Sequence, residues 1–188
     1  MLKPTCRLLQ SSFKGQITTN GDQLTYKITR SVPYKTSKFI STVKQVNEYQ
    51  EFLPFCEISK MSPFRERHLR EEAQGTLHIG FGSITDKYTS RVIYSPDKNQ
   101  IKALNLDGNV FKKMSSNWTF KDTTSFGEAG LEHGTEYTFQ IDCTFGNPIY
   151  SKIGKAAFPR VSEMMVKSFE NRVKEKVLAD KEKIAVKN

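Results

Sequence analysis

A long helix is predicted near the C-terminus, over about residues 147–177, because apolar residues recur there at every fourth position. Asn147 and Pro148 suit its N-cap and first helical position, and Pro159 is expected to bend it near its middle. At about 1.5 Å per residue this helix is on the order of 40 Å long, enough to cross a small domain. The stripe expected to face the core consists of Ile149, Ile153, Ala157, Val161, Met165 and Phe169, widened by Phe158, Met164, Arg172 and Val173.

Most of the chain before this helix alternates between apolar and polar residues, which is the period of half-buried strands. The first predicted strand covers residues 24–30, and two short helices follow over residues 35–45 and 47–52. Pro54 then keeps Leu53 out of the helical conformation. Six further strands are predicted near residues 58–64, 76–81, 88–94, 103–106, 114–121 and 136–145, with a loop over residues 123–131.

These elements predict an α+β fold in which a curved, seven-stranded antiparallel sheet wraps around the long C-terminal helix. The two short helices follow the first strand. Residues 22–178 are expected to form one domain and residues 179–188 a flexible basic tail. The facing aromatic residues of sheet and helix leave two possibilities open, an apolar cavity between them or a solid core.

The first twenty residues differ in composition from the rest, since they contain Lys3, Arg7 and Lys14 but no acidic residue. A basic, amphipathic start of this kind is typical of a mitochondrial targeting segment. An ordinary disordered terminus has the same appearance. On either interpretation, residues 1–20 are expected to lie outside the fold.

The charge and cysteine content narrow the class of protein. A net charge of +9 in 188 residues suggests a negatively charged partner, such as anionic lipid, nucleic acid or an acidic protein, although basic proteins without such a partner are common. Cys6, Cys56 and Cys143 have neither metal-site nor disulfide spacing, which fits a reducing compartment. No apolar run approaches the roughly 20 residues that span a bilayer.

Several motifs together resemble one known family. Tyr34, Val43, Val46, Tyr49 and Phe52 lead into the block Leu53-Pro54-Phe55-Cys56. Further on come Gly80-Phe81, Tyr88-Thr89-Ser90-Arg91-Val92, Asp107-Gly108, Phe111, Trp118-x-Phe120 and Phe169-x2-Arg172. From about residue 26 to residue 172 the chain resembles the mitochondrial coenzyme Q-binding proteins of the START-like (helix-grip) family. Two departures are Phe55, where that family often has Trp, and Pro159, which has no clear place in its pattern.

This resemblance implies a helix-grip fold that binds ubiquinone in an apolar tunnel and acts as a lipid carrier or chaperone for respiration and coenzyme Q biosynthesis. It implies a peripheral location on the matrix side of the mitochondrial inner membrane. The implied partners are ubiquinone, the anionic membrane surface and coenzyme Q biosynthetic or respiratory complexes, with no nucleic acid. It implies no catalytic residue, no catalytic cofactor and no metal site.

Family resemblance and face assignment together predict the binding residues. The ligand residues expected are Leu53, Pro54, Phe55, Trp118, Phe120, Tyr137, Phe139, Phe158, Val161 and Met165. The entrance is expected between residues 53–55, residues 127–134 and the long helix, which Pro159 either lets shift or bends permanently. A membrane-facing cluster is expected at Lys174, Lys176, Lys181 and Lys183, which also fits a solvated helix end.

Two other functions stay open. START-like relatives include polyketide aromatase/cyclases, but such an enzyme needs a general acid or base near its ligand, and His68, His78 and His133 are expected at the surface. Arg91 lies on the face opposite Tyr88, where it orders a quinone headgroup or pairs with an acid. Bacterial relatives resemble an inhibitor of ribosomal subunit association, yet the aromatic residues here alternate inward, which disfavours RNA stacking.

Overall fold

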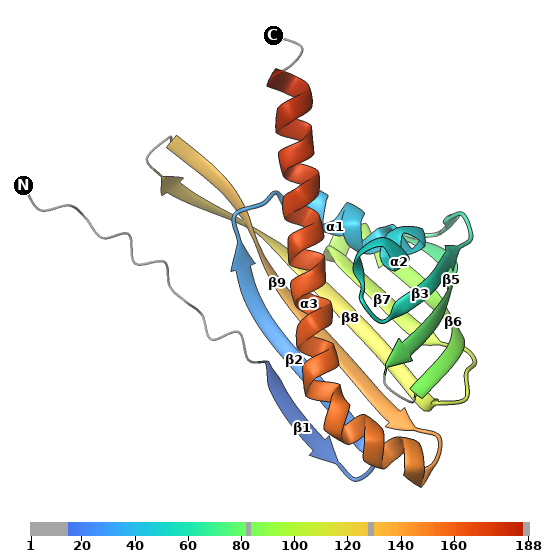
Figure 1. Cartoon of the computed structure of the whole chain (residues 1–188). Coiled ribbons are helices and arrows are strands. Elements are labelled where there is room, and N and C mark those ends of the chain that lie inside the picture. Colours follow the sequence, from blue (N-terminus) through green and yellow to red (C-terminus); the bar gives the residue numbers. More distant parts are fainter. Residues whose placement is uncertain (1–14, 82–83, 128–129, 186–188) are drawn as a thin grey trace, which may run out of the picture.

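A computed structural model describes residues 15–81, 84–127 and 130–185. Those residues form one large sheet with all helices on one of its faces (Figure 1). The elements, in chain order, are β1 (Gln16–Asn20), β2 (Gln23–Val32), α1 (Thr36–Lys44), η1 (Val46–Glu48), α2 (Tyr49–Phe52), β3 (Cys56–Met61), β4 (Arg65–Arg67), β5 (Arg70–Phe81), β6 (Ile84–Ser95), η2 (Pro96–Lys98), β7 (Gln100–Asn105), β8 (Phe111–Gly127), β9 (Gly130–Phe145) and α3 (Pro148–Ala185).

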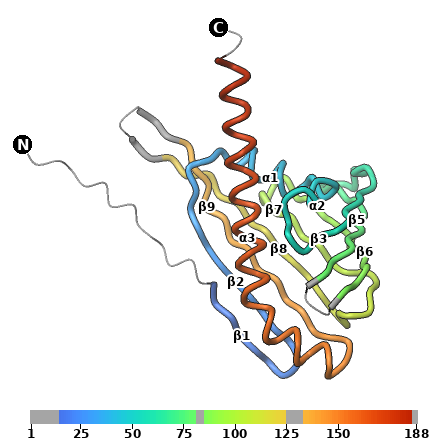
Figure 2. Tube along the Cα trace, in the orientation of Figure 1, coloured from blue at the N-terminus to red at the C-terminus, as the bar shows by residue number. Residues whose placement is uncertain are grey.

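The sheet is antiparallel throughout the described residues, with the strand order β1-β2-β9-β8-β7-β6-β5-β3 and with β4 paired to β5. Helix α3 lies along its concave face and contacts β9 and β2, while α1 and α2 lie beside α3 and contact it (Figures 1 and 2). The predicted α+β class, a curved antiparallel sheet around a long C-terminal helix, is therefore confirmed.

The densest part of the core lies where α1 covers the sheet. The ring of Phe39 from α1 is 5.7 Å from Trp118, 5.4 Å from Phe120 and 4.7 Å from Tyr137, measured between centroids. All four side chains are buried. Tilted aromatic pairs at such distances contribute about 0.5–1.5 kcal/mol each beyond the area they bury. This cluster fills one part of the concave face and leaves the part under α2 and the start of α3 less completely filled.

The described residues contain nine strands rather than the predicted seven, and β1 and β4 are the additional ones. Strand β1 lies within the segment expected outside the fold, and it pairs with β2 from Gln16 to Asn20. The two-residue turn between them contains Gly21, whose φ of 58° suits the first position of a hairpin turn. The dipeptide Gly21-Asp22 is a sequence signal for this hairpin, which the basic composition of the segment does not indicate.

The loop predicted over residues 123–131 is also wrong, because β8 continues to Gly127 and β9 starts at Gly130. The two strands pair through this region, from Thr123 opposite Gly134 to Gly127 opposite Gly130. Figure 1 shows the resulting hairpin extending away from α2. Thr and Gly residues suggested a loop, but the ladder of backbone hydrogen bonds continues through them.

Helix α3 continues to Ala185, eight residues past its predicted end. Its buried residues are Gly154, Phe158, Ser162, Val166, Phe169 and Val173. The predicted stripe is wrong at its start, because Ile149 and Ile153 are 70% and 38% exposed. A step of four residues turns about 400° in a helix of 3.6 residues per turn, so the stripe drifts by about 40° per step. Over five steps this is roughly 200°, so the two ends of the stripe face opposite sides.

The N-terminal part of α3, orange in Figures 1 and 2, runs in a different direction from the rest of the helix. Pro159 lies within the helix. Its missing amide leaves the carbonyl of Lys155 without the usual i−4 bond, and its ring pushes against that carbonyl. The bend agrees with the predicted kink, and it sets the first turns of α3 across the end of the sheet.

Candidate functional site

Two adjoining apolar chambers lie between the sheet and the helices. The first, here called the α2 chamber, has a volume of about 100 Å³ and is lined by Val43, Val46, Tyr49, Leu53, Phe55, Gly75, Leu77, Tyr88, Ser90, Val92, Ile101, Ala103, Met114, Ser116, Trp118, Phe139, Ile141, Met165 and Phe169. The second, the α3 chamber, has a volume of about 120 Å³ and is lined by Phe55, Ile79, Tyr88, Val110, Phe111, Met114, Ile141, Phe145, Gly154, Ala157, Phe158, Val161, Ser162 and Met165. The space between sheet and helix is therefore partly hollow.

Five side chains line both chambers and form the partition between them, namely Phe55, Tyr88, Met114, Ile141 and Met165. Two of them are methionines, one from β8 and one from α3. Methionine is unbranched and has three rotatable side-chain bonds, so it changes shape at low cost. Met114 and Met165 are therefore the residues of the partition whose side chains change conformation most readily.

A few hydroxyl groups interrupt the apolar walls. Ser90 and Ser116 line the α2 chamber, and Tyr88 lines both chambers. Burial raises the pKa of Tyr88, so its phenol stays neutral and able to donate a hydrogen bond. The hydroxyl of Tyr49 is already used, because it donates to the carbonyl oxygen of Val43 at 2.5 Å. The walls thus suit a largely apolar molecule that carries a few hydrogen-bond acceptors.

The carboxylate of Asp86 shapes one rim of the α3 chamber. One of its oxygens accepts hydrogen bonds from the backbone amides of Val110, at 2.9 Å, and Asn109, at 3.2 Å. The carbonyl oxygen of Val110 in turn accepts from the amide of Gly146 at 2.8 Å. These bonds tie the loop between β7 and β8 to the residues just before α3. The start of α3 is thereby placed directly beside this chamber.

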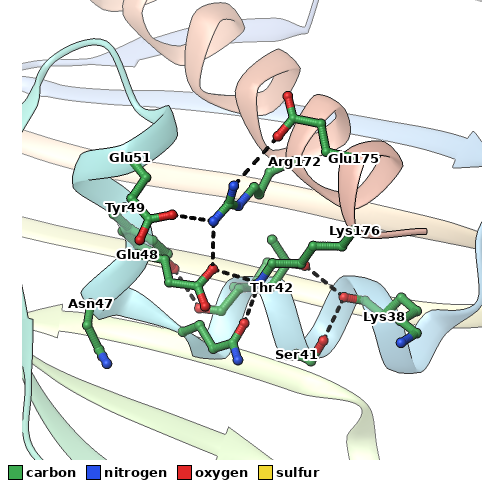
Figure 3. Close-up of polar contacts among 12 residues, drawn as sticks. Lys38, Ser41, Thr42, Asn47, Glu48, Tyr49, Glu51, Arg172, Glu175 and Lys176 are labelled. Carbon is green, nitrogen blue, oxygen red and sulfur yellow. Dashed lines mark hydrogen bonds and ion pairs between the residues drawn. The ribbon is translucent and has the colours of Figure 1, made fainter. Parts of the chain in front are cut away.

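A group of ion pairs holds the C-terminal half of α3 against η1 and α2 (Figure 3). Arg172 Nη2 lies 3.2 Å from Glu48 Oε2 and also contacts Glu51, while Nη1 lies 3.6 Å from Glu175. Lys176 Nζ reaches the same Glu48 oxygen at 2.7 Å. Burial alone would raise the pKa of Glu48, but the bonds from Lys176 and Arg172 outweigh it and lower the pKa. The ion pairs fix α3 over the α2 chamber.

Glu170 makes a second attachment of α3, to the sheet. Its Oε1 accepts a hydrogen bond from the Tyr137 hydroxyl at 2.6 Å and another from Arg30 Nε at 2.8 Å. Burial, followed by the neighbouring charge of Glu170, raises the pKa of Tyr137, so the phenol remains the donor. Tyr137 on β9 and Arg30 on β2 therefore anchor the helix to the sheet.

The structure brings most of the predicted ligand residues to the chamber walls. Leu53, Phe55, Trp118, Phe139, Phe158, Val161 and Met165 line one chamber or both. Pro54 is exposed, Phe120 packs in the cluster around Phe39, and Tyr137 bonds to Glu170, so these three are not in the walls. Pro54 lies between two lining residues, Leu53 and Phe55. Phe120 and Tyr137 lie on the same inward strand faces as Trp118 and Phe139, but those faces also supply the solid part of the core.

The predicted entrance does not match the fold. Residues 128 and 129 lie outside the described residues, but the hairpin that they join extends away from the segment 53–55 (Figure 1). These two segments therefore do not enclose a common opening. Half-exposed Phe55, Ile79 and Phe111 lie in the chamber walls instead, so neither chamber is sealed.

Sequence reasoning missed the residues of the partition other than Phe55 and Met165. Met114 lies at an even position of β8, like Trp118, and Ile141 lies at an odd position of β9, like Phe139. Successive odd or even positions of a strand share one face. The alternation that predicts the two aromatic residues therefore also indicates Met114 and Ile141.

The residues expected outside the cavity are also placed. Lys174, Lys181 and Lys183 are exposed on α3, whereas Lys176 is engaged with Glu48. His68, His133 and Arg91 are exposed and His78 is half-buried. Within residues 15–81, 84–127 and 130–185, no cluster of three His, Cys, Asp or Glu side chains is arranged to hold a metal ion. The helices of those segments include none that is both long and apolar enough to cross a bilayer.

Comparison with known proteins agrees with this geometry. Residues 32–170 match the family described as polyketide cyclase / dehydrase and lipid transport. The chain is 23% identical over 160 residues to the mitochondrial coenzyme Q-binding protein coq10 of Schizosaccharomyces pombe, covering 84% of this chain and 93% of that protein. It is 28% identical over 155 residues to the ribosome association toxin RatA of Rickettsia prowazekii, covering 81% and 97%. The Zhui aromatase/cyclase from Streptomyces sp. R1128 shares the fold, with a TM-score of 0.64 at 15% identity over 82% of this chain and 96% of that one.

Proposed function

The chain belongs to the polyketide cyclase / dehydrase and lipid transport family, and from that premise we propose that it binds ubiquinone and carries it as a lipid chaperone. The observation that carries the proposal is the pair of adjoining apolar chambers under α3. The similarity to a protein named for coenzyme Q binding, over most of both chains, supports the choice of ligand. Hydroxyl donors in apolar walls suit a quinone, which has carbonyl acceptors on one end of a hydrocarbon tail.

The free energy of transferring ubiquinone from a bilayer favours a carrier with modest affinity over a protein that holds it tightly. Each buried CH2 of an isoprenoid tail gains about 0.8 kcal/mol relative to water. The tail leaves a bilayer that is just as apolar, so its transfer into the chambers is close to neutral. Rates of entry and exit, rather than affinity, then decide how the protein works, as expected for a protein that passes its ligand on.

Occupation by a whole quinone requires the two chambers to act as one. Chambers of about 100 and 120 Å³ are smaller, even taken together, than the roughly 300–1,000 Å³ of typical ligand pockets, so the joined cavity must also expand around its ligand. Rotation of Met114 and Met165 out of the partition would provide an elongated cavity, with the neutral hydroxyl of Tyr88 at its middle. In this proposal the ligand itself stabilises the open arrangement by replacing the contacts that the methionines give up.

The cellular setting proposed is the matrix side of the mitochondrial inner membrane, with delivery of ubiquinone to respiratory electron transport and coenzyme Q biosynthesis. The relatives named as coenzyme Q-binding proteins are also named mitochondrial, which supports this location. The basic balance of the chain suits an anionic membrane surface. The role proposed is binding rather than catalysis, with ubiquinone as ligand and not as a catalytic cofactor.

Two neighbouring alanines on α3 provide the test. Ala157 lines the α3 chamber, whereas Ala156 is exposed. The Ala157→Phe variant places a ring in the chamber, and Ala156→Phe adds the same ring outside. Solvent extraction of each purified protein, with mass spectrometry of the extract, is expected to show ubiquinone with the wild type and with Ala156→Phe. Ala157→Phe is expected to retain roughly tenfold less, with an unchanged circular dichroism spectrum.

Several outcomes contradict the proposal. Equal ubiquinone retention by the two variants would show that the α3 chamber is not the binding site. Absence of ubiquinone from the wild-type extract, together with no uptake of added quinone in detergent solution, would show that the protein does not bind it. Steep salt-dependent binding of RNA without any bound lipid would favour ribosome association instead, and conversion of an aromatic polyketide would favour an enzyme.

A further inference from the structure

The first turns of α3 present large apolar side chains to solvent. Ile149 is 70% exposed and Ile153 is 38% exposed. The two residues are four apart on a helix, so they lie on one face, one turn apart. Ala157, one turn further along, lines the α3 chamber. A strip of apolar surface therefore leads from the outside of the helix to the edge of the chamber.

Positive charge surrounds this strip. No Asp or Glu occurs between Asp142 and Glu163, while Lys152, Lys155 and Arg160 lie in that interval. All three basic side chains are exposed. Apolar residues flanked by cations, without acidic residues, are the composition of helices that lie in the plane of an anionic lipid surface. At about 100° per residue, Arg160 falls on the same face as the two isoleucines and Lys152 beside it, whereas Lys155 lies toward the other side of the helix. We call the region formed by Ile149, Ile153, Lys152 and Arg160 the docking surface.

The C-terminal end of the same helix offers a contrast. Between residues 172 and 183 its five basic residues are interspersed with Glu175, Asp180 and Glu182. Lys176 is paired with Glu48 at 2.7 Å, and Asp180 is paired with Lys38 at 2.5 Å. Of the membrane-facing cluster expected there, Lys176 is therefore paired with an acid, while Lys174, Lys181 and Lys183 are exposed among acidic residues. The start of α3 differs because its cations have no acidic residue among them in sequence.

The geometry points to the docking surface as the place where this protein meets an anionic membrane, with Ile149 and Ile153 in the headgroup layer and Lys152 and Arg160 against lipid phosphates. This inference rests on the proposed function, because it identifies the route by which a lipid reaches the chambers. The tail of the ligand would pass from the bilayer along the apolar strip into the α3 chamber. Its headgroup could hydrogen-bond to Tyr88, which lines the α3 chamber as well as the α2 chamber.

Both ends of α3 carry two exposed aliphatic residues, which allows a matched comparison. Leu178 and Ile184 are 49% and 62% exposed at the C-terminal end. The test variant is Ile149→Ser with Ile153→Ser, and the control is Leu178→Ser with Ile184→Ser. Binding is measured by flotation of the full-length protein with vesicles of phosphatidylcholine, with and without cardiolipin.

A second pair of variants separates charge from apolar contact. Lys152→Gln with Arg160→Gln removes two charges from the docking surface, and Lys174→Gln with Lys181→Gln removes two exposed charges from the other end. The docking-surface variants are expected to lose roughly tenfold in vesicle partitioning, while both controls stay within about twofold of the wild type. Added salt is expected to weaken wild-type binding to the cardiolipin vesicles.

Retention of quinone in detergent solution is also measured for every variant. A loss of membrane binding can then be distinguished from a loss of quinone binding. Loss of vesicle binding with unchanged quinone retention supports the inference. Equal vesicle binding by the Ile149/Ile153 variant and the wild type overturns it, as does a loss confined to the C-terminal variants. If light scattering shows a wild-type dimer that the Ile149/Ile153 variant dissociates, without vesicle binding, the surface buries a second copy of the chain and the inference is wrong. Absence of quinone from the wild type contradicts the proposed function alone.

Discussion

Replacement of Arg172 by Met tests how α3 is held over the α2 chamber. The Arg172 side chain is only 21% exposed. Methionine keeps much of its apolar stem but lacks the guanidinium. The substitution breaks the contacts with Glu48, Glu51 and Glu175 (Figure 3). It also removes the cation that lies 5.7 Å from the centre of the Phe52 ring.

The expected loss follows from the exposure of each partner. The bond to Glu48, whose side chain is 27% exposed, is a charge-assisted hydrogen bond worth about 1.5–3 kcal/mol. Glu51 and Glu175 are 52% and 65% exposed, and such surface pairs contribute about 0–1 kcal/mol each. Lys176 remains beside Glu48 and limits the penalty of leaving that carboxylate without Arg172. Arg172→Met is therefore expected to lower the free energy of unfolding by about 2 kcal/mol.

The pH dependence of stability provides a second test of the contact between Arg172 and Glu48. Bonds from Lys176 and Arg172 lower the folded-state pKa of Glu48 below its usual value of 4.5, against the opposing effect of burial. A carboxyl group with a lowered folded pKa stabilises the fold fully above its unfolded pKa, and this stability is lost as the pH falls through the folded pKa. The wild type is thus expected to lose stability below about pH 4.5, and Arg172→Met to lose less over that interval.

Urea unfolding of the wild type, Arg172→Met, Glu48→Gln and the double variant measures the coupling directly. A coupling of about 1–2 kcal/mol near neutral pH is expected, and it should shrink on acidification. Arg172→Lys is a control that keeps the charge but not the fork of donors, and an intermediate loss is expected from it. A coupling close to zero, or identical acid profiles for wild type and Arg172→Met, would refute this account of how α3 is attached.

Three further predictions concern the interior. Phe169→Ala removes a ring that is 2% exposed and lies against three other aromatic rings. The free energy of unfolding measured in urea is expected to fall by about 3–5 kcal/mol. A fall of less than about 1 kcal/mol would contradict the packing. Gly154→Ala should lower the melting temperature despite the better helix propensity of alanine, because the new Cβ would lie 2.0 Å from the Phe145 ring; a rise would show that this ring moves freely. Burial raises the pKa of Cys56 to about 11 and that of Cys143 to about 12, so peptide mapping after thiol alkylation at mildly basic pH should find both unmodified in the native protein and modified in urea. Because both thiols are neutral in the fold, stability should fall as the pH rises above about 9, and fast native alkylation of either would refute their burial.

Local periodicity was sufficient to predict the architecture. Alternation in strands such as β9 placed Phe139 and Tyr137 on the inner face, and both are fully buried. The strand segments that periodicity missed are those where hydrogen bonding to a neighbouring strand outweighs the local composition. Strand β1 is exposed along its whole length and is held by its hydrogen bonds to β2. The β8–β9 hairpin continues through Gly and Thr residues for the same reason.

The candidate site could be predicted only in part, because facing inward and lining a chamber are different properties. Phe120 and Trp118 lie on the same face of β8, yet only Trp118 borders the α2 chamber. Phe39, which is distant in sequence, packs from α1 against both rings, so the alternation along β8 does not distinguish the residue that borders the chamber from the one that does not. The apolar stripe predicted on α3 does not all face the core either, because four-residue steps drift around the helix. Ile149 is therefore exposed, whereas Phe169 is buried.

The sequence by itself determined which residues face inward along each strand, because that depends only on the two-residue period of the backbone. Where the interior is solid and where it is hollow was decided by the tertiary structure. Phe39 fills one part of the concave face, whereas the bend of α3 and the ion pairs of Arg172 hold the helix across the remainder. A void is the space that contacts between distant segments fail to fill, so no local pattern in the chain specifies it.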